Sequence, residues 1–148
     1  MKRLIILLML SLNCSTTAYA QDAKIRVFIE ATANDTVGQQ LVYELRETLN
    51  RSAHLTEAQS GDLSLFQIKI VTLDPSPDGS SIQSSTVYSM VLTGSMLNGS
   101  KGKIFMDHWV GICGGSMAAK CAMQLIASAD SDMTPAAQAI KEILRKKS

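Results

Sequence analysis

The spacing of apolar residues changes along this chain from two to four and back again, and this order limits the folds that it can adopt. Residues 25–30 alternate in a period of two, which is typical of a half-buried strand. Residues 37–49 place an apolar residue at every fourth position, which predicts an amphipathic helix of about four turns. Residues 34–36 offer N-caps for that helix, and residues 52–57 indicate a short strand.

Three longer segments with strand-like patterns follow. They are residues 63–73, 81–95 and 103–112, and turn signals at residues 75–79 and 98–102 separate them. Because these connections are short, we expect an antiparallel meander.

The last third of the chain is predicted to be helical. Residues 117–129 repeat small and apolar side chains at helical spacing, and the helix is expected to end near residues 130–132. Thr134 followed by Pro135 favours a new start, because proline is well placed at the first helical position. Two separate helices are therefore expected.

This order of elements predicts an α+β fold with two layers. A mostly antiparallel sheet of about four or five strands would carry the helices on one face. The other face would present Arg26, Glu30, Gln67 and Lys69 to solvent or to a partner. Residues 21–148 suffice for a single domain with its own core.

Residues 1–20 have the pattern of a signal peptide. A basic start precedes an apolar run over residues 4–12, and Ala18 and Ala20 stand at the positions that signal peptidase reads. The run is about nine residues, against the roughly 20 that cross a bilayer, so we expect cleavage and no membrane span. Cys14 follows the run without the leucine and small residue that lipid attachment requires, which favours cleavage after Ala20 over a lipid anchor.

The short basic start favours a bacterial leader and a periplasmic location, with secretion as the alternative. In a eukaryotic secretory route, residues 34–36, 50–52 and 98–100 would be glycan acceptors. Loss of Lys2 and Arg3 leaves 12 of the 14 basic side chains against 13 acidic ones. This near-neutral balance gives no reason to expect nucleic acid or anionic lipid as a partner.

Cys113 and Cys121 are the two cysteines that remain after cleavage, and an even number in an exported protein favours a disulfide. The pair would join a strand end to the next helix, and the short loop would contribute about 2–3 kcal/mol in the chain-entropy treatment. A redox-active pair normally has two intervening residues, whereas this pair has seven. A metal site would need more ligands than His54 and His108 add.

An enzymatic reading would use Cys113 as nucleophile and His108 as base. Strand alternation sets Asp107 and His108 on opposite faces, which argues against a dyad. It sets His108 on the face of Ile104, Met106, Val110 and Ile112. No other catalytic motif and no cofactor motif stands out, so a non-catalytic protein without a cofactor or metal is predicted.

Phe105 and Trp109 are expected together on the other face of that strand. They either form an apolar patch for a partner or pack in a second small cluster. Gly114 and Ser116 lie in the loop that the disulfide would anchor, a second candidate contact site. The glycines there either leave room for the turn or bind an anion at the helix N-terminus.

The segment from Ile25 to Leu73 runs from a strand to the helix Val37–Leu49, a polar piece that ends at Asp62, and a long alternating strand. This order resembles the small α/β domains of envelope proteins such as the TolB N-terminal domain, the curli-secretion protein CsgG and the lipopolysaccharide-assembly protein LptE. The resemblance covers about a third of the chain and implies assembly, secretion or docking. The lipobox of CsgG and LptE is missing, and no functional residue carries over.

The leading hypothesis is an exported, periplasmic protein that binds or helps to assemble another envelope component. The second is an inhibitor of an enzyme such as a cell-wall hydrolase. The third is an enzyme, which would need a concave pocket with clustered polar groups. The sequence leaves the partner and the oligomeric state open.

Overall fold

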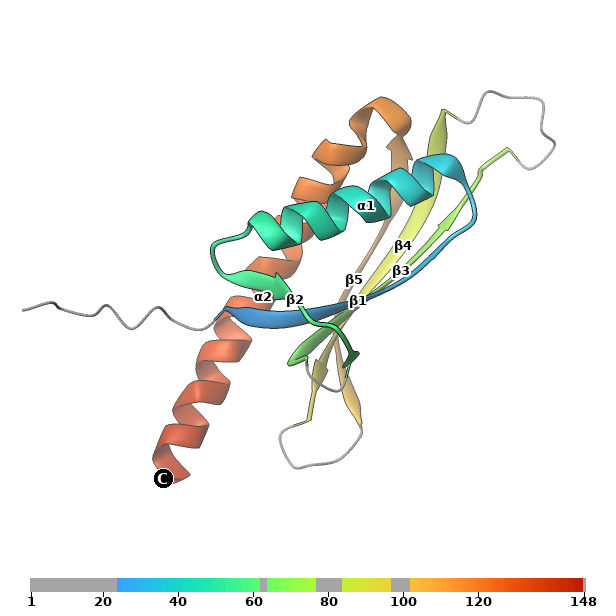
Figure 1. Cartoon of the computed structure of the whole chain (residues 1–148). Helices are drawn as coiled ribbons and strands as arrows, with labels where there is room; N and C mark the ends of the chain where they lie inside the picture. Colours follow the sequence, from blue (N-terminus) through green and yellow to red (C-terminus); the bar gives the residue numbers. More distant parts are fainter. Residues whose placement is uncertain (1–23, 62–63, 77–83, 97–101, 148) are drawn as a thin grey trace, which may run out of the picture.

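The computed structural model describes residues 24–61, 64–76, 84–96 and 102–147. The longer elements in these ranges are five strands and two helices (Figure 1). In chain order they are β1 (Ile25–Ala33), α1 (Thr36–Arg51), β2 (Leu55–Glu57), β3 (Phe66–Leu73), β4 (Ser85–Ser95), β5 (Lys103–Gly114), the 3-10 turn η3 (Gly115–Met117) and α2 (Ala118–Lys147).

The described strands form one sheet in the order β2-β1-β3-β4-β5. β1 pairs in parallel with β2 and β3, whereas β4 pairs antiparallel with β3 and β5 over longer ladders. The predicted meander and the mostly antiparallel sheet are therefore confirmed, and the short strand expected at 52–57 is β2.

The core lies between the sheet and the helices. One sheet face contributes every second residue of β1, β3 and β4, and both helices pack their apolar stripes on it, so the predicted α+β fold is confirmed. The largest fully buried side chains are Val27, Ile29, Leu41, Leu45, Leu49, Leu55, Phe66, Ile68, Ile70, Met90, Leu92 and Met133.

Asp35 caps α1 and ties it to the middle of the sheet. Its carboxylate accepts hydrogen bonds from the backbone N–H of Gly38 (2.6 Å) and from the hydroxyls of Thr72 (3.0 Å) and Thr86 (2.9 Å). Asp35 is buried, so these bonds replace the water that the carboxylate loses. A Cβ on Gly38 would lie 1.9 Å from the Thr72 hydroxyl oxygen, so only glycine lets α1 approach β3 this closely.

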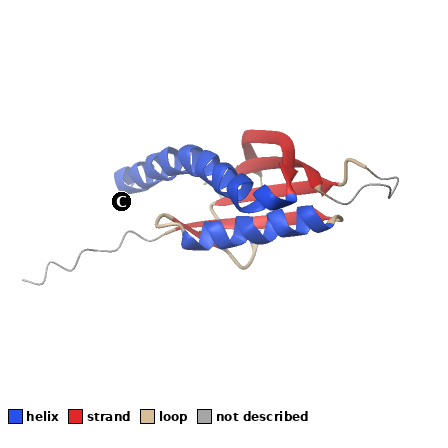
Figure 2. Cartoon of the chain, turned by 90° about the horizontal axis from the view of Figure 1, so that it is seen from above, coloured by secondary structure: helices blue, strands red, loops and turns tan. Residues whose placement is uncertain are grey.

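The predicted break between two C-terminal helices is wrong. α2 runs without interruption from Ala118 to Lys147 with Pro135 inside it, and Figure 2 shows its curved path. The hydroxyl of Thr134 donates to the Asp130 carboxylate (2.8 Å) within the helix instead of capping a new one. Met133 is fully buried, and this packing outweighs the hydrogen bond that proline removes.

Several strand limits differ from those predicted. β3 begins at Phe66 and β4 at Ser85, and β5 continues to Gly114. The predicted leader and the turn residues 77–79 and 98–101 lie outside the described residues.

Candidate interaction surface

The sheet face opposite the helices is called the open face here. Its side chains alternate with the buried residues of each strand. The four polar residues predicted for this face lie on it. Its residues are Arg26, Phe28 and Glu30 of β1, Gln67, Lys69, Val71 and Leu73 of β3, Val87, Ser89, Val91 and Thr93 of β4, and Phe105, His108, Val110 and Ile112 of β5.

A β-bulge in β5 decides which of its side chains reach the open face. Thr93 pairs with Phe105, but Leu92 pairs with Asp107, so Met106 is the extra residue. The alternation of sides therefore shifts by one position after Met106. The Phe105 and His108 rings lie on the same face, with centroids 6.2 Å apart.

The expectation that Phe105 and Trp109 share a face is wrong because of this bulge. Phe105 is 62% exposed on the open face. Trp109 pairs with the buried Met90 on the helix-covered face, where it is half-buried and packs against the core. Replacing Trp109 would therefore disturb core packing as well as any contact with a partner.

His108 shares its face with Val110 and Ile112, as expected. Ile104, which was expected beside it, pairs with Gly94 and lies on the other face. Met106 also lies on that other face, with its sulfur near Gly94.

Asp107 and His108 lie on opposite faces, as predicted. The backbone N–H of His108 donates to the Asp107 carboxylate (2.7 Å), so this contact does not involve the imidazole. The sulfur of Cys113 is bonded to Cys121 and so offers no free thiol for nucleophilic attack.

Four apolar residues at one end of the open face form the apolar patch: Leu73, Val87, Val110 and Ile112. Leu73 pairs with Val87, and Val87 pairs with Ile112, so a row of apolar side chains crosses β3, β4 and β5. Leu73, Val110 and Ile112 are 59%, 65% and 70% exposed. Large side chains this exposed and this close together are typical of interaction sites.

Charged residues occupy the open face beyond the apolar patch. The Lys69 ammonium lies 2.9 Å from the Glu30 carboxylate, which also accepts a hydrogen bond from the Gln67 amide (2.7 Å). The hydrogen bond and positive charge of Lys69 hold the pKa of Glu30 below its ordinary value. The open face therefore has an apolar end and a hydrogen-bonded ionic region.

The chain between β2 and β3 crosses β1 at the end remote from the apolar patch (Figure 1). The N–H of Ala58 donates to the Val27 carbonyl (2.8 Å), and that of Leu65 donates to the Arg26 carbonyl (3.1 Å). A Cβ on Gly61 would lie 3.4 Å from the Phe28 ring. This crossing lies over Phe28, whereas the apolar patch remains exposed.

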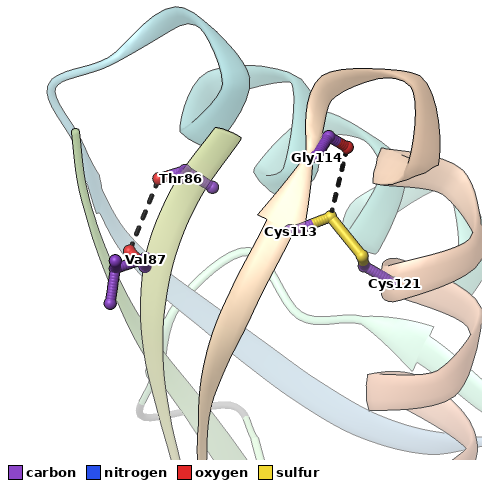
Figure 3. The surroundings of a disulfide bond; sticks show 5 residues. All are labelled: Thr86, Val87, Cys113, Gly114 and Cys121. Atoms are coloured by element: carbon purple, nitrogen blue, oxygen red, sulfur yellow. Dashed lines mark hydrogen bonds between the residues drawn. A yellow bond between two sulfur atoms is a disulfide. The ribbon is translucent and has the colours of Figure 1, made fainter. Parts of the chain in front are cut away.

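Cys113 and Cys121 form the predicted disulfide, with their Cα atoms 6.3 Å apart. Figure 3 shows the bond joining the end of β5 to the first turns of α2. Gly114 is half-buried and Ser116 is exposed in η3, at the opposite end of β5 from Phe105. The structure therefore does not bring these predicted contact residues together in one site.

A groove of about 370 Å³ lies between the outer sides of α1 and α2. It is lined by Glu44, Thr48, Arg51, Ser52, Ala119, Met123, Ile126, Ala127 and Asp130, none of which the sequence had suggested as functional.

No group of three or more acidic, histidine or cysteine side chains in the described ranges could hold a metal ion. No helix among the described residues is long and apolar enough to cross a membrane.

The apolar patch was missed from the sequence, although a signal for it exists. Val71, Leu73, Val87, Val110 and Ile112 are apolar at positions opposite the core, where a sheet exposed to solvent usually carries polar residues.

No family model and no curated protein matches the sequence.

Proposed function

We propose that this protein is exported and acts by binding another component of the cell envelope, without catalysing a reaction. The observation that carries this proposal is the apolar patch on the open face. Three of its four residues are more than half exposed, and contiguous exposed apolar side chains often mark functional surfaces.

The surroundings of the apolar patch support a protein partner. Interfaces commonly combine an apolar centre with a polar rim, and Lys69, Glu30 and Gln67 continue the open face as such a rim. Phe105 adds an exposed aromatic ring on the same face. A rigid sheet loses little conformational entropy when a partner covers it.

The leader pattern and the disulfide support export. A disulfide persists in an oxidising compartment such as the periplasm, and Cys113–Cys121 joins two residues on either side of one turn. Fractionation of cells that express the whole chain tests this part. Recovery of an uncleaved chain from the cytosol would contradict export.

Site-specific photo-crosslinking in intact cells tests the binding surface. A photoreactive residue at position 73 should link the protein to an envelope component, whereas one at Tyr43 should not. Tyr43 is a matched control because it is 61% exposed on α1, in the helix layer. Leu73→Lys should abolish crosslinking from position 87. Identical crosslinks from positions 73 and 43, or none from either, would refute the assignment.

The turn after β5 supports an enzyme inhibitor as the second candidate. The disulfide holds one side of this turn, and the Gly115 N–H donates to the Ser84 carbonyl (2.8 Å) on the other. Ser116 is exposed between these anchors. If inhibition is the function, Ser116→Arg should abolish it in a cell-wall hydrolase assay, and Leu73→Lys should not.

A further inference from the structure

We propose that two copies of this chain associate through the outer edge of β5, in antiparallel register with Val110 on the two-fold axis. This inference goes beyond the proposed function because it concerns the edge of the sheet, although Val110 and Ile112 of the apolar patch would also contact the second copy. In the described ranges β5 pairs on one side with β4, and no other described strand pairs with its outer edge.

The two edges of the sheet differ in length and in protection. β2, at one edge, has three residues, whereas β5, at the other, has twelve. Long edge strands invite pairing unless charges, prolines or bulges block them. In β5 the charges Lys103 and Asp107 and the bulge at Met106 all lie in the first half. The stretch 108–112 has none of these features.

The requirement that paired residues share a face restricts the register. In an antiparallel pair, residues directly opposite each other point to the same side of the sheet. For two identical copies of β5, one residue must therefore lie directly opposite its own counterpart. The two-fold axis then passes between these two equivalent residues. Centring it on Val110 pairs the whole stretch 108–112 with itself and leaves the bulge outside.

Side-chain sizes favour Val110 over its neighbours as the centre. With Val110 on the axis, Trp109 of one copy lies opposite Gly111 of the other, where the Tyr88 ring from β4 covers the glycine, so the indole meets that ring and not a second indole. Centring on Trp109 would oppose two indole rings. Centring on Gly111 would oppose Trp109 to Cys113, whose side chain is fully buried. The Val110 register also brings no two like charges opposite each other.

Apolar side chains of the open face would also contact the second copy. Val110 would meet its counterpart directly, and Ile112 would lie diagonally beside it on the other copy. These two side chains are 65% and 70% exposed, so pairing would remove apolar area from water in addition to completing the backbone hydrogen bonds of β5. An extended peptide of another protein would gain the backbone bonds without this self-matched contact.

Charge exchange at position 110 tests the register. Sedimentation of the purified full chain should give a dimer, Val110→Lys and Val110→Glu should each be monomeric, and an equal mixture of the two should restore a dimer. Only a residue that meets itself across the axis gives this pattern. Leu73→Lys, on β3 away from the edge, should remain dimeric, which separates this result from loss of the envelope partner.

Crosslinking provides a second measurement that does not need a charged substitution. Val110→Cys should form a covalent dimer under mild oxidation, because directly opposite residues lie within disulfide range, whereas Leu73→Cys should not. A wild-type chain that stays monomeric up to about 1 mM overturns the proposal. So does a dimer that persists in the Val110→Lys and Val110→Glu variants, or equal crosslinking of the two cysteine variants.

Discussion

Replacing Asp35 by alanine is expected to lower the free energy of unfolding by about 1.5–5 kcal/mol. The carboxylate accepts the Gly38 N–H bond at the start of α1, and loss of such a cap costs about 0.5–2 kcal/mol. The substitution also leaves the buried Thr72 hydroxyl without its acceptor, which costs about 1–3 kcal/mol. The Thr86 hydroxyl keeps the Leu73 carbonyl (3.2 Å) as an acceptor and adds little.

A second substitution separates these contributions. Thr72→Val should destabilise the wild-type protein, because it removes a donor to the Asp35 carboxylate. In the Asp35→Ala background the same change should stabilise the protein, because it replaces an unpaired buried hydroxyl with a methyl group. Asp35→Asn keeps a capping oxygen and should cost less than Asp35→Ala.

Urea unfolding followed by circular dichroism and by tryptophan fluorescence measures these effects. Trp109 is the one tryptophan of the chain, and its half-buried position makes its emission sensitive to unfolding. The slope of free energy against urea should stay constant across the variants. A loss below about 0.5 kcal/mol for Asp35→Ala, or destabilisation by Thr72→Val in both backgrounds, would refute the reasoning.

Three further outcomes are expected. Replacing Cys113 and Cys121 together by serine should cost about 2–3 kcal/mol in urea unfolding, since a cross-link between residues eight positions apart removes that much chain entropy; an unchanged midpoint would contradict this. Gly38→Ala should cost about 1–3 kcal/mol through its clash with a β3 threonine, whereas Gly114→Ala, whose nearest neighbour would be 3.7 Å away, should leave the thermal midpoint unchanged. Glu30→Gln should make the free energy of unfolding fall less steeply as the pH is lowered. The pKa of Glu30 is lowered in the folded state, so its contribution to stability is present above the unfolded-state pKa and is lost as pH falls through the folded-state pKa. Parallel curves of unfolding free energy against pH for the two proteins would argue against this.

The elements that sequence analysis predicted well are those with a strong local pattern. The four-residue spacing of Leu41, Leu45 and Leu49 defines α1 because one stripe of that helix is buried. The Cys113–Cys121 pairing also followed from local features, a strand end and a helix start separated by glycines.

The features that sequence analysis missed depend on packing between distant segments. Pro135 predicts a helix start by its chemistry, but the buried Met133 keeps α2 continuous. The bulge at Met106 changes the face of every later residue in β5, and no residue type in the sequence predicts it. The parallel pairing of β1 with β3 depends on a chain crossing that periodicity does not encode.

The disulfide joins residues eight positions apart, whereas the parallel ladder joins Val27 to Phe66. A bond between such near neighbours needs only one turn to form and does not require the distant strands to meet. An oxidised thiol pair is therefore no proof that the sheet has assembled. A gel assay that detects free thiols would classify a chain with an unformed β1–β3 ladder as folded. Native folding of this protein is therefore better followed through amide hydrogen exchange in that ladder.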